Sequence, residues 1–307
     1  MAWRFDECLE VPTDGGHVVV YRRAAPGRPQ MLLTHGTGFC ASTWAGVADL
    51  VAADFDVFAI DRRGHGLSSA PDDAYDFTDF ARDTVAVVDA VGFRDGYAVG
   101  HSAGATDLLL CAAARPDAFR RMFVIEPTAM DPDQPGVRAD MADLHGEFLA
   151  RFGERRAVFS SREEVVERYS GRGAFTGWRP DLLEQFAQDG FRDLDDGSVA
   201  LRCDPASEVS MLRRIFAAME GTYRAGEADH PFRALAQVPC PVLIARTEHS
   251  QDVYEPMADV VERLVPDTAG LLFDGLGHLA AQVDPGRVAA EILRFWRVGE
   301  SGDGGTV

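Results

Sequence analysis

The pentapeptide Gly100–Gly104 reads G-H-S-A-G and places Ser102 at the centre of the pattern G-x-S-x-G. An apolar, strand-like run at Tyr97–Val99 precedes it, and a helix-like run at Ala105–Ala114 follows it. A sharp turn from a strand into a helix exposes the hydroxyl of such a serine at the tip of a sheet. The two glycines suit this turn because they have no Cβ to clash where the chain approaches itself. The spacing therefore predicts a nucleophilic serine at position 102.

A serine nucleophile needs a base, and His278 has the most suitable position among the eight histidines. It ends the segment L-L-F-D-G-L-G-H, in which a predicted last strand is followed by a glycine-containing turn. An unassisted hydroxyl is a weak nucleophile near neutral pH, so the base must lie within hydrogen-bond reach. We predict that His278 is this base; the alternative is a solvent-exposed turn histidine.

Two carboxylates compete for the third role, which is to orient the histidine. Glu126 directly follows the apolar run M-F-V-I, where a carboxylate is costly unless it is hydrogen-bonded or functional. Asp252 lies in the segment R-T-E-H-S-Q-D-V, after another apolar strand. We favour Glu126, whose alternative role is to bond a backbone turn at a pocket rim. The alternative role of Asp252 is to cap the helix expected at Pro256–Leu264.

Strand-like and helix-like segments alternate along the chain, which predicts an α/β fold with a mostly parallel sheet flanked by helices. The expected strands are His17–Arg22, Gln30–Thr34, Phe55–Ile60, Tyr97–Val99, Met122–Ile125, Pro241–Ala245 and Leu271–Phe273. The expected helices between them are Trp44–Ala53, Phe77–Val91, Ala105–Ala114, Pro256–Leu264 and Arg287–Trp296.

Residues 131–237 break this alternation. They hold four amphipathic segments, at Met141–Phe152, Glu163–Tyr169, Pro180–Gln188 and Ser207–Met219. A stretch of this length cannot be a structureless loop in a compact domain, so we predict an inserted helical cap.

The composition narrows the classes of partner. The net charge of −19 argues against nucleic acid and anionic membranes, which bind basic patches. No apolar stretch reaches the roughly 20 residues that span a bilayer, and the N-terminus lacks a signal-peptide pattern. Five scattered cysteines fit a reducing compartment, so we expect a cytoplasmic protein. We expect no metal and no cofactor, since metal-ligand spacings and nucleotide loops are missing from the sequence. Whether the protein forms a homo-oligomer is left open.

Together these motifs resemble the α/β-hydrolase superfamily over nearly the whole chain. The resemblance rests on the serine and histidine segments, on H-G-T-G-F at His35–Phe39, and on D-R-R-G-H-G-L-S at Asp61–Ser68. It implies the α/β-hydrolase fold, with a core formed by residues 1–130 and 238–300. It also fits the helical cap expected at 131–237. The last residues, G-E-S-G-D-G-G-T-V, predict a flexible tail at 301–307.

The resemblance assigns further roles. It implies an oxyanion hole in which the amide of Ala103 and that of Gly36 or Thr37 stabilise the negative charge of acyl transfer. It implies a structural role for His65 and a place beneath the site for His101. The family order of serine, acid, histidine fits both acid candidates. The usual acid position after the seventh strand is taken by Ser250, whereas some members place the acid after the sixth strand, where Glu126 lies.

An elbow serine implies an acyl-enzyme from an ester, lactone, thioester or amide, because haloalkane dehalogenases and epoxide hydrolases of this superfamily use an aspartate there. We expect a small hydrophobic ester or lactone as substrate, in contact with Phe39, Met130 and Trp178. Phe175, Met211, Phe216 and Met219 are further candidates for the pocket roof, although cap core is the more usual role of such residues.

A narrower resemblance concerns Ser102, Glu126 followed by P-T, and His278, which are similar to the arrangement in zearalenone lactonases. Those capped hydrolases open a resorcylic macrolide lactone. The H-G-T-G loop departs from their D-G-type loop, and the cap of this chain is longer than in fungal members. The open alternatives are a carboxylesterase or thioesterase, a cofactor-free peroxidase or C–C hydrolase with the same triad, and a non-enzymatic ligand receptor.

Overall fold

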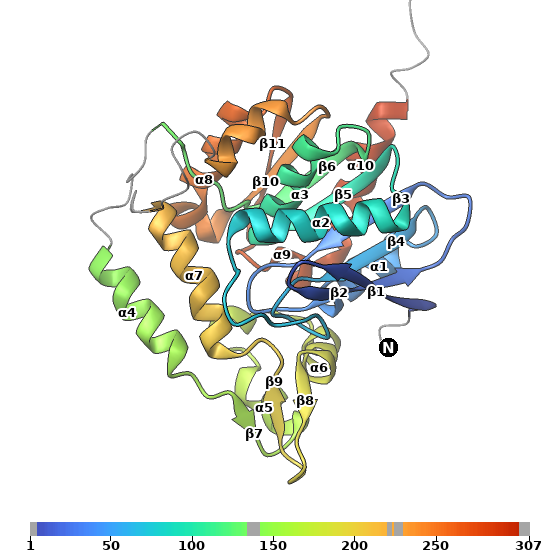
Figure 1. The fold of residues 1–307 in the computed structure, drawn as a ribbon. Coiled ribbons are helices and arrows are strands. Elements are labelled where there is room, and N and C mark those ends of the chain that lie inside the picture. Colours follow the sequence, from blue (N-terminus) through green and yellow to red (C-terminus); the bar gives the residue numbers. More distant parts are fainter. Residues whose placement is uncertain (1–4, 134–141, 220–222, 224–229, 301–307) are drawn as a thin grey trace, which may run out of the picture.

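The computed structural model describes residues 5–133, 142–219, 223 and 230–300, without the side chains of residues 142–144, 251–253 and 298–300. Its centre is an eight-stranded sheet in the order β1-β2-β4-β3-β5-β6-β10-β11 (Figure 1). The strands are β1 (Glu7–Thr13), β2 (Gly16–Arg23), β3 (Gln30–Thr34), β4 (Asp56–Asp61), β5 (Gly96–His101), β6 (Phe119–Ile125), β10 (Val242–Thr247) and β11 (Thr268–Phe273).

Six neighbouring strands from β4 to β11 pair in parallel, and β2 is antiparallel to both of its neighbours. Successive residues of a strand point to opposite faces, and both faces of this sheet are covered. In β3, Leu32 belongs to the core on one face, whereas Met31 and Leu33 belong to the core on the other. The apolar runs of β3, β4, β5, β6 and β10 are therefore central strands that are mostly buried on both sides, whereas β11 lies at the edge of the sheet and is partly exposed.

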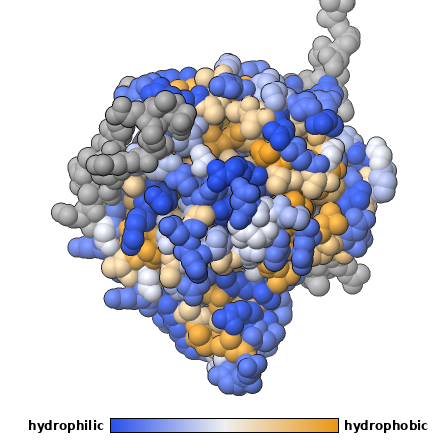
Figure 2. Space-filling model, viewed as in Figure 1, coloured by the Kyte–Doolittle hydropathy of each residue, from blue (hydrophilic) through white to orange (hydrophobic). Residues whose placement is uncertain are grey.

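Helices cover the two faces of the sheet. The core of one face includes residues of α2 (Phe77–Val91), α3 (Ala103–Ala114) and α8 (Gln251–Leu264). The core of the other includes residues of α1 (Ala45–Val51), α9 (Ala280–Val283) and α10 (Pro285–Glu300). Within the described part of the chain, no helix is long and apolar enough to cross a membrane. Figure 2 shows hydrophilic residues over most of one face, with hydrophobic residues in small groups.

Residues 142–219, called the cap segment below, lie at one end of the sheet (Figure 1). Its helices are α4 (Ala142–Gly153), α5 (Arg162–Tyr169), α6 (Pro180–Asp189) and α7 (Pro205–Met219). A small antiparallel sheet in the order β7-β9-β8 lies among them, formed by β7 (Val158–Phe159), β8 (Phe191–Asp193) and β9 (Val199–Leu201). Short 3-10 turns at Ala41–Trp44, Gly173–Phe175, Pro231–Gln237 and Glu248–Ser250 complete the described elements.

The strands and helices expected from the sequence are present, with differences at their ends. The helix expected at Pro256–Leu264 begins five residues earlier, at Gln251, so Pro256 lies inside α8 instead of starting it. Strand β1 and the three cap strands were not predicted. The cap strands have two or three residues each, too few for an alternating pattern to be recognised.

Two buried arginines hold the turn after β4, in the D-R-R-G-H-G motif. Arg62 donates to both carboxylate oxygens of Asp107 in α3, over distances of 2.5 and 3.2 Å. Arg63 pairs with Asp83 of α2 in the same bidentate way, at 2.6 and 2.7 Å. All four residues are buried. These pairs fix the turn against the two helices that flank the central strands.

We expect Asp107→Leu to lower the free energy of unfolding by about 3–5 kcal/mol, because it leaves the Arg62 guanidinium buried without its partner. The control is Asp89→Ala, which breaks the exposed Arg115–Asp89 pair and should cost less than about 1 kcal/mol. Urea unfolding of the two variants measures the difference. Equal losses would show that the buried pair does not hold this turn.

Candidate active site

Ser102 lies between β5 and α3, with φ 55° and ψ −128°. This backbone conformation is rare for a residue other than glycine and marks a strained turn. A Cβ at Gly100 would lie 2.5 Å from Ala105 Cα, and one at Gly104 would collide with the carbonyl oxygen of His35. Both glycines of the G-x-S-x-G pattern are therefore required by close backbone contacts, and the strand-to-helix turn expected from the sequence is present.

Glu126 and His278 lie within hydrogen-bond distance, with 2.6 Å between Glu126 Oε2 and His278 Nδ1. Glu126 follows β6 directly and also has a positive φ, of 46°. Its other oxygen, Oε1, accepts from the backbone amide and hydroxyl of Thr247, at 3.0 and 2.6 Å, and from the hydroxyl of Ser250. The carboxylate is buried but fully hydrogen-bonded, as a charge at that depth must be.

These contacts set the protonation state of Glu126. Burial raises the pKa of the carboxyl, but the hydrogen bond and charge of His278 and the hydroxyls of Ser250 and Thr247 outweigh it. The pKa of Glu126 is therefore below its ordinary value, and the side chain is ionised at neutral pH. An ionised acceptor at Nδ1 fixes the His278 tautomer that leaves Nε2 free to take a proton.

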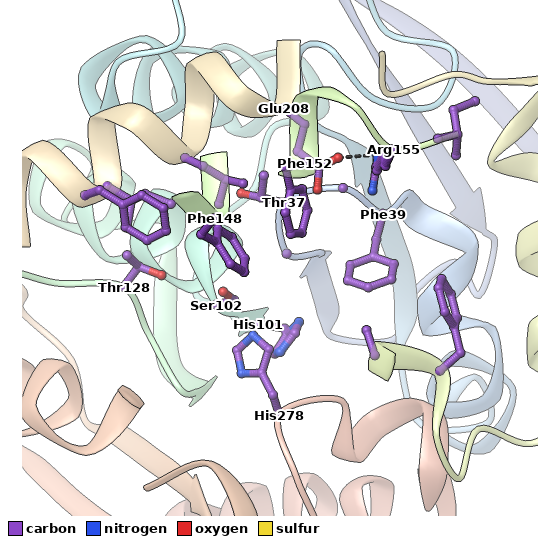
Figure 3. A pocket seen from close by; sticks show the side chains of 18 of the residues that line it. Thr37, Phe39, His101, Ser102, Thr128, Phe148, Phe152, Arg155, Glu208 and His278 are labelled. Carbon is purple, nitrogen blue, oxygen red and sulfur yellow. Dashed lines mark ion pairs between the residues drawn. The ribbon is translucent and has the colours of Figure 1, made fainter. Parts of the chain in front are cut away.

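His278 contacts two aromatic rings. Tyr254 of α8 stacks on it almost in parallel, with 3.9 Å between centroids and 6° between planes. His101 lies on another side with its centroid at 4.4 Å. Burial and the nearby His278 hold the pKa of His101 well below its usual range, so His101 is neutral. Figure 3 shows Ser102, His101 and His278 at one end of the same cavity.

Two neutral histidines fix the loop at Gly36–Phe39. His65 accepts from the amide of Gly38 at 2.9 Å through Nε2, and its Nδ1 donates to the Arg63 carbonyl at 2.9 Å. His35 donates through Nδ1 to the carbonyl of Gly36 at 2.8 Å. Burial and the charge of Arg62 lower the pKa of His65 to about 3. The loop that contains Gly36 and Thr37 is thus held beside Ser102 by uncharged rings.

The amide of Ala103 begins α3, where the first backbone N–H groups have no acceptor within the helix. Gly36, Thr37 and Ser102 line the cavity together. The loop and the start of α3 therefore flank the serine as an oxyanion hole requires.

The cavity has a volume of about 820 Å³, within the range of small-molecule sites. The core contributes the loop at Gly36–Phe39, His101, Ser102, Thr128, Tyr254, Met257 and His278. The cap segment contributes a mainly aromatic and aliphatic wall, which includes Phe148, Phe152, Phe159, Tyr169, Phe175, Phe186, Leu212, Ile215, Phe216 and Met219. The lining therefore favours a largely apolar ligand.

Phe39 lines this cavity, as expected, but Met130 and Trp178 do not. Met130 is buried in the core on the face of the sheet that α2, α3 and α8 cover. Trp178 is in the core of the cap segment, and its ring centroid lies 5.7 Å from that of Phe39. Met211 packs with Tyr75 and Phe80 instead of lining the roof. Met130 and Trp178, the two predicted substrate contacts that fail, are thus core residues. Hydrophobicity alone does not show whether a side chain faces the protein core or a ligand cavity.

The alternative acid, Asp252, lies in the first turn of α8, and its side chain is outside the described part of the structure. Ser250, which precedes α8, donates its hydroxyl to Glu126.

The sequence did not predict that Tyr254, Arg155 and Glu208 line the cavity. Tyr254 directly follows the segment R-T-E-H-S-Q-D-V that contains Asp252, but nothing in the neighbouring sequence indicates that a tyrosine there stacks on a histidine. The described residues contain no cluster of three or more potential metal ligands.

A model of the alpha/beta hydrolase family matches residues 31–291, so the chain belongs to this family. The 2-(acetamidomethylene)succinate hydrolase of Mesorhizobium japonicum is 26% identical over 290 residues, 94% of this chain and 96% of the relative. The non-heme haloperoxidase of Rhodococcus erythropolis is 28% identical over 292 residues, 93% of this chain and 98% of the relative.

Solved structures show the same fold. The crystal structure of E-2-(acetamidomethylene)succinate hydrolase has a TM-score of 0.76 at 23% identity, covering 96% of this chain and 100% of the other. The thioesterase domain from the curacin biosynthetic pathway has a TM-score of 0.72 at 18% identity, covering 94% of this chain and 99% of the other. The fold is therefore that of an alpha/beta hydrolase.

The contacts of Glu126 predict its effect on turnover. We expect Glu126→Ala to lower kcat for a 4-nitrophenyl ester by about 10⁴-fold, because His278 loses its orientation and the partner of its charged form. Asp252→Ala should leave kcat unchanged. Steady-state kinetics of both variants decide the assignment, and a large loss in Asp252→Ala alone would overturn it.

Proposed function

We propose that this chain is a serine hydrolase that cleaves a hydrophobic carboxylic ester or lactone through an acyl-enzyme. The observation that carries the proposal is the buried Glu126–His278 hydrogen bond of 2.6 Å beside the strained elbow of Ser102. An ionised carboxylate, an imidazole and an elbow serine form the arrangement that activates a hydroxyl for acyl transfer. The apolar cavity above them supports a hydrophobic acyl or alcohol group.

In the proposed mechanism, His278 Nε2 takes the proton of Ser102 as the serine Oγ attacks the ester carbonyl carbon. Glu126 stabilises the imidazolium that results. The amides of Ala103 and of Gly36 or Thr37 donate to the oxyanion. The intermediate collapses, the C–O bond of the leaving alcohol breaks, and His278 returns the proton to it. Water, activated by His278, then hydrolyses the acyl-enzyme and releases the carboxylic acid.

The relatives support hydrolysis in general. The Mesorhizobium japonicum relative is named for the hydrolysis of 2-(acetamidomethylene)succinate, and one structural neighbour is a thioesterase domain. Ester and lactone cleavage by this chain rests on the serine and its cavity, and on the superfamily resemblance of its motifs. Within this class, the specific substrate that we propose is a resorcylic macrolide lactone such as zearalenone. Two features support it: the position of the acid at Glu126, and an aromatic lining on which a phenolic ring could stack.

A second candidate is the use of hydrogen peroxide instead of water against the same acyl-enzyme. The observation that favours it is the similarity to a non-heme haloperoxidase along 93% of the chain. Peroxide would attack the acyl carbon, release Ser102 and leave a peracid, so that no metal or redox cofactor is needed. Formation of peracetic acid from an acetate ester and peroxide, with Ser102→Ala as control, tests this candidate.

We expect Ser102 to react with a fluorophosphonate probe, because His278 and Glu126 activate its hydroxyl. Ser102→Ala should abolish both labelling and ester hydrolysis while leaving the fold unchanged, as judged by circular dichroism. Mass spectrometry of the labelled peptide identifies the site. A wild-type protein that binds esters but is neither labelled nor active would instead be a ligand receptor.

We also expect the purified protein to open the lactone of zearalenone, since the cavity volume and its aromatic wall suit a macrolide. Chromatography of the reaction mixture measures the loss of the lactone and the appearance of the ring-opened acid. The control substrate is 4-nitrophenyl butyrate. Rapid hydrolysis of the control with zearalenone left intact would reject the macrolide while retaining the ester hydrolase.

A further inference from the structure

The cap side of the cavity carries charge that the mechanism above does not use. Its charged residues are three arginines and one glutamate, Arg155, Arg156, Arg168 and Glu208. This excess of positive charge contrasts with the net charge of −19 of the whole chain. Charge of one sign inside an apolar cleft raises the local concentration of ligands of the opposite sign. Arg155 pairs with Glu208 and Arg156 with Glu164, so the question is which of these arginines could also bind an anionic group of a largely apolar ligand.

Of these arginines, Arg155 is the one that the fold holds inside the site. Arg156 is exposed and donates to both oxygens of Glu164, at 2.6 and 2.9 Å, and Arg168 is also exposed. The Arg155 side chain is 27% exposed, and Figure 3 shows it above Phe39 in the cavity wall. Its guanidinium carbon lies 5.4 Å from the centre of the Phe152 ring.

Arg155 is incompletely satisfied by the protein. It forms an ion pair with Glu208 of α7 through Nη2. Its Nε is buried and has no hydrogen-bond partner among the described residues. A buried donor without an acceptor is costly and calls for a partner that the protein alone does not supply. A carboxylate at the Nε–Nη2 edge would satisfy Nε and use the planar fork of the guanidinium.

Glu208 contacts the Nη2 side of Arg155 only, and it connects this pair to the loop at Gly36–Phe39. Its carboxylate packs against Gly38, where a Cβ would collide with Oε1. Burial raises the pKa of Glu208 to about 7, although the charge of Arg155 opposes this. Near neutral pH the side chain can therefore take a proton, which weakens its hold on Arg155 and its repulsion of an incoming anion.

We propose that Arg155 is a substrate-binding residue that pairs with a carboxylate of the substrate at the cap end of the cavity, in exchange for Glu208. The inference rests on the proposed serine hydrolase and narrows its substrate class. The substrates it points to are esters or lactones with a carboxylate remote from the scissile carbonyl. Neutral substrates, a macrolide lactone included, lack this contact and react with a lower kcat/KM.

The test uses pairs of 4-nitrophenyl esters of linear dicarboxylic acids, in which the far carboxyl is either free or methylated. We expect wild-type protein to prefer the free acid at one chain length. Arg155→Met should lower kcat/KM for that acid by about 10- to 100-fold more than it lowers kcat/KM for the methylated ester. Glu208→Gln should lower KM for the acid, because it removes the competing charge. Arg179→Met removes an exposed cap arginine paired with Asp181 and should change neither substrate.

The outcomes separate the inference from the proposed function. Equal effects of Arg155→Met on the two esters, or none on either, overturn the anion site and leave the hydrolase intact. Failure of Ser102 labelling together with no cleavage of any ester overturns the proposed function itself. If Ser102 is labelled but both esters are inert, suberate should protect Ser102 from labelling in wild type and not in Arg155→Met. Equal protection in both proteins overturns the inference.

Discussion

The hydrogen bond between Glu126 and His278 is the interaction on which the site depends. Glu126 is buried, and an isolated carboxylate at that depth would be costly. The cost is offset by His278 on one oxygen and by Thr247 and Ser250 on the other. The same contacts keep the carboxylate ionised and aim the imidazole. Stability of the buried charge and orientation of the base therefore come from one set of bonds.

The sheet makes this interaction geometrically available. Ser102 follows β5, Glu126 follows β6, and Thr247 ends β10, and these three strands are neighbours in the parallel sheet. Parallel strands end at the same edge, so the loops after them converge there. Both Ser102 and Glu126 adopt positive φ at that edge, so the backbone turns there instead of continuing as a strand. The neutral rings of His35 and His65 then hold the neighbouring loop in place.

The sequence was informative where a local pattern reflects a local constraint. The glycines around Ser102, the glycine turn before His278 and the carboxylate after a buried run at Glu126 pointed to residues that lie together in the structure. Ser102 and His278 line one cavity, and Glu126 contacts His278; their catalytic roles stay predictions. The sequence was least informative about the cavity wall. Apolar residues such as Met130 and Trp178 read alike whether they pack in a core or face a ligand, and only the folded arrangement separates them. The cap strands are too short to give a pattern, and the stacking of Tyr254 depends on residues distant in the sequence.

The proton on His278 Nδ1 tests the central claim most directly. In protein labelled with ¹⁵N-histidine, the NMR resonance of this proton should lie far downfield of the backbone amides, because it is shared with an ionised carboxylate. We predict a large upfield shift in Glu126→Gln and an unchanged resonance in Asp252→Asn. A resonance unaffected in Glu126→Gln but shifted in Asp252→Asn would contradict the account and assign the acid to Asp252.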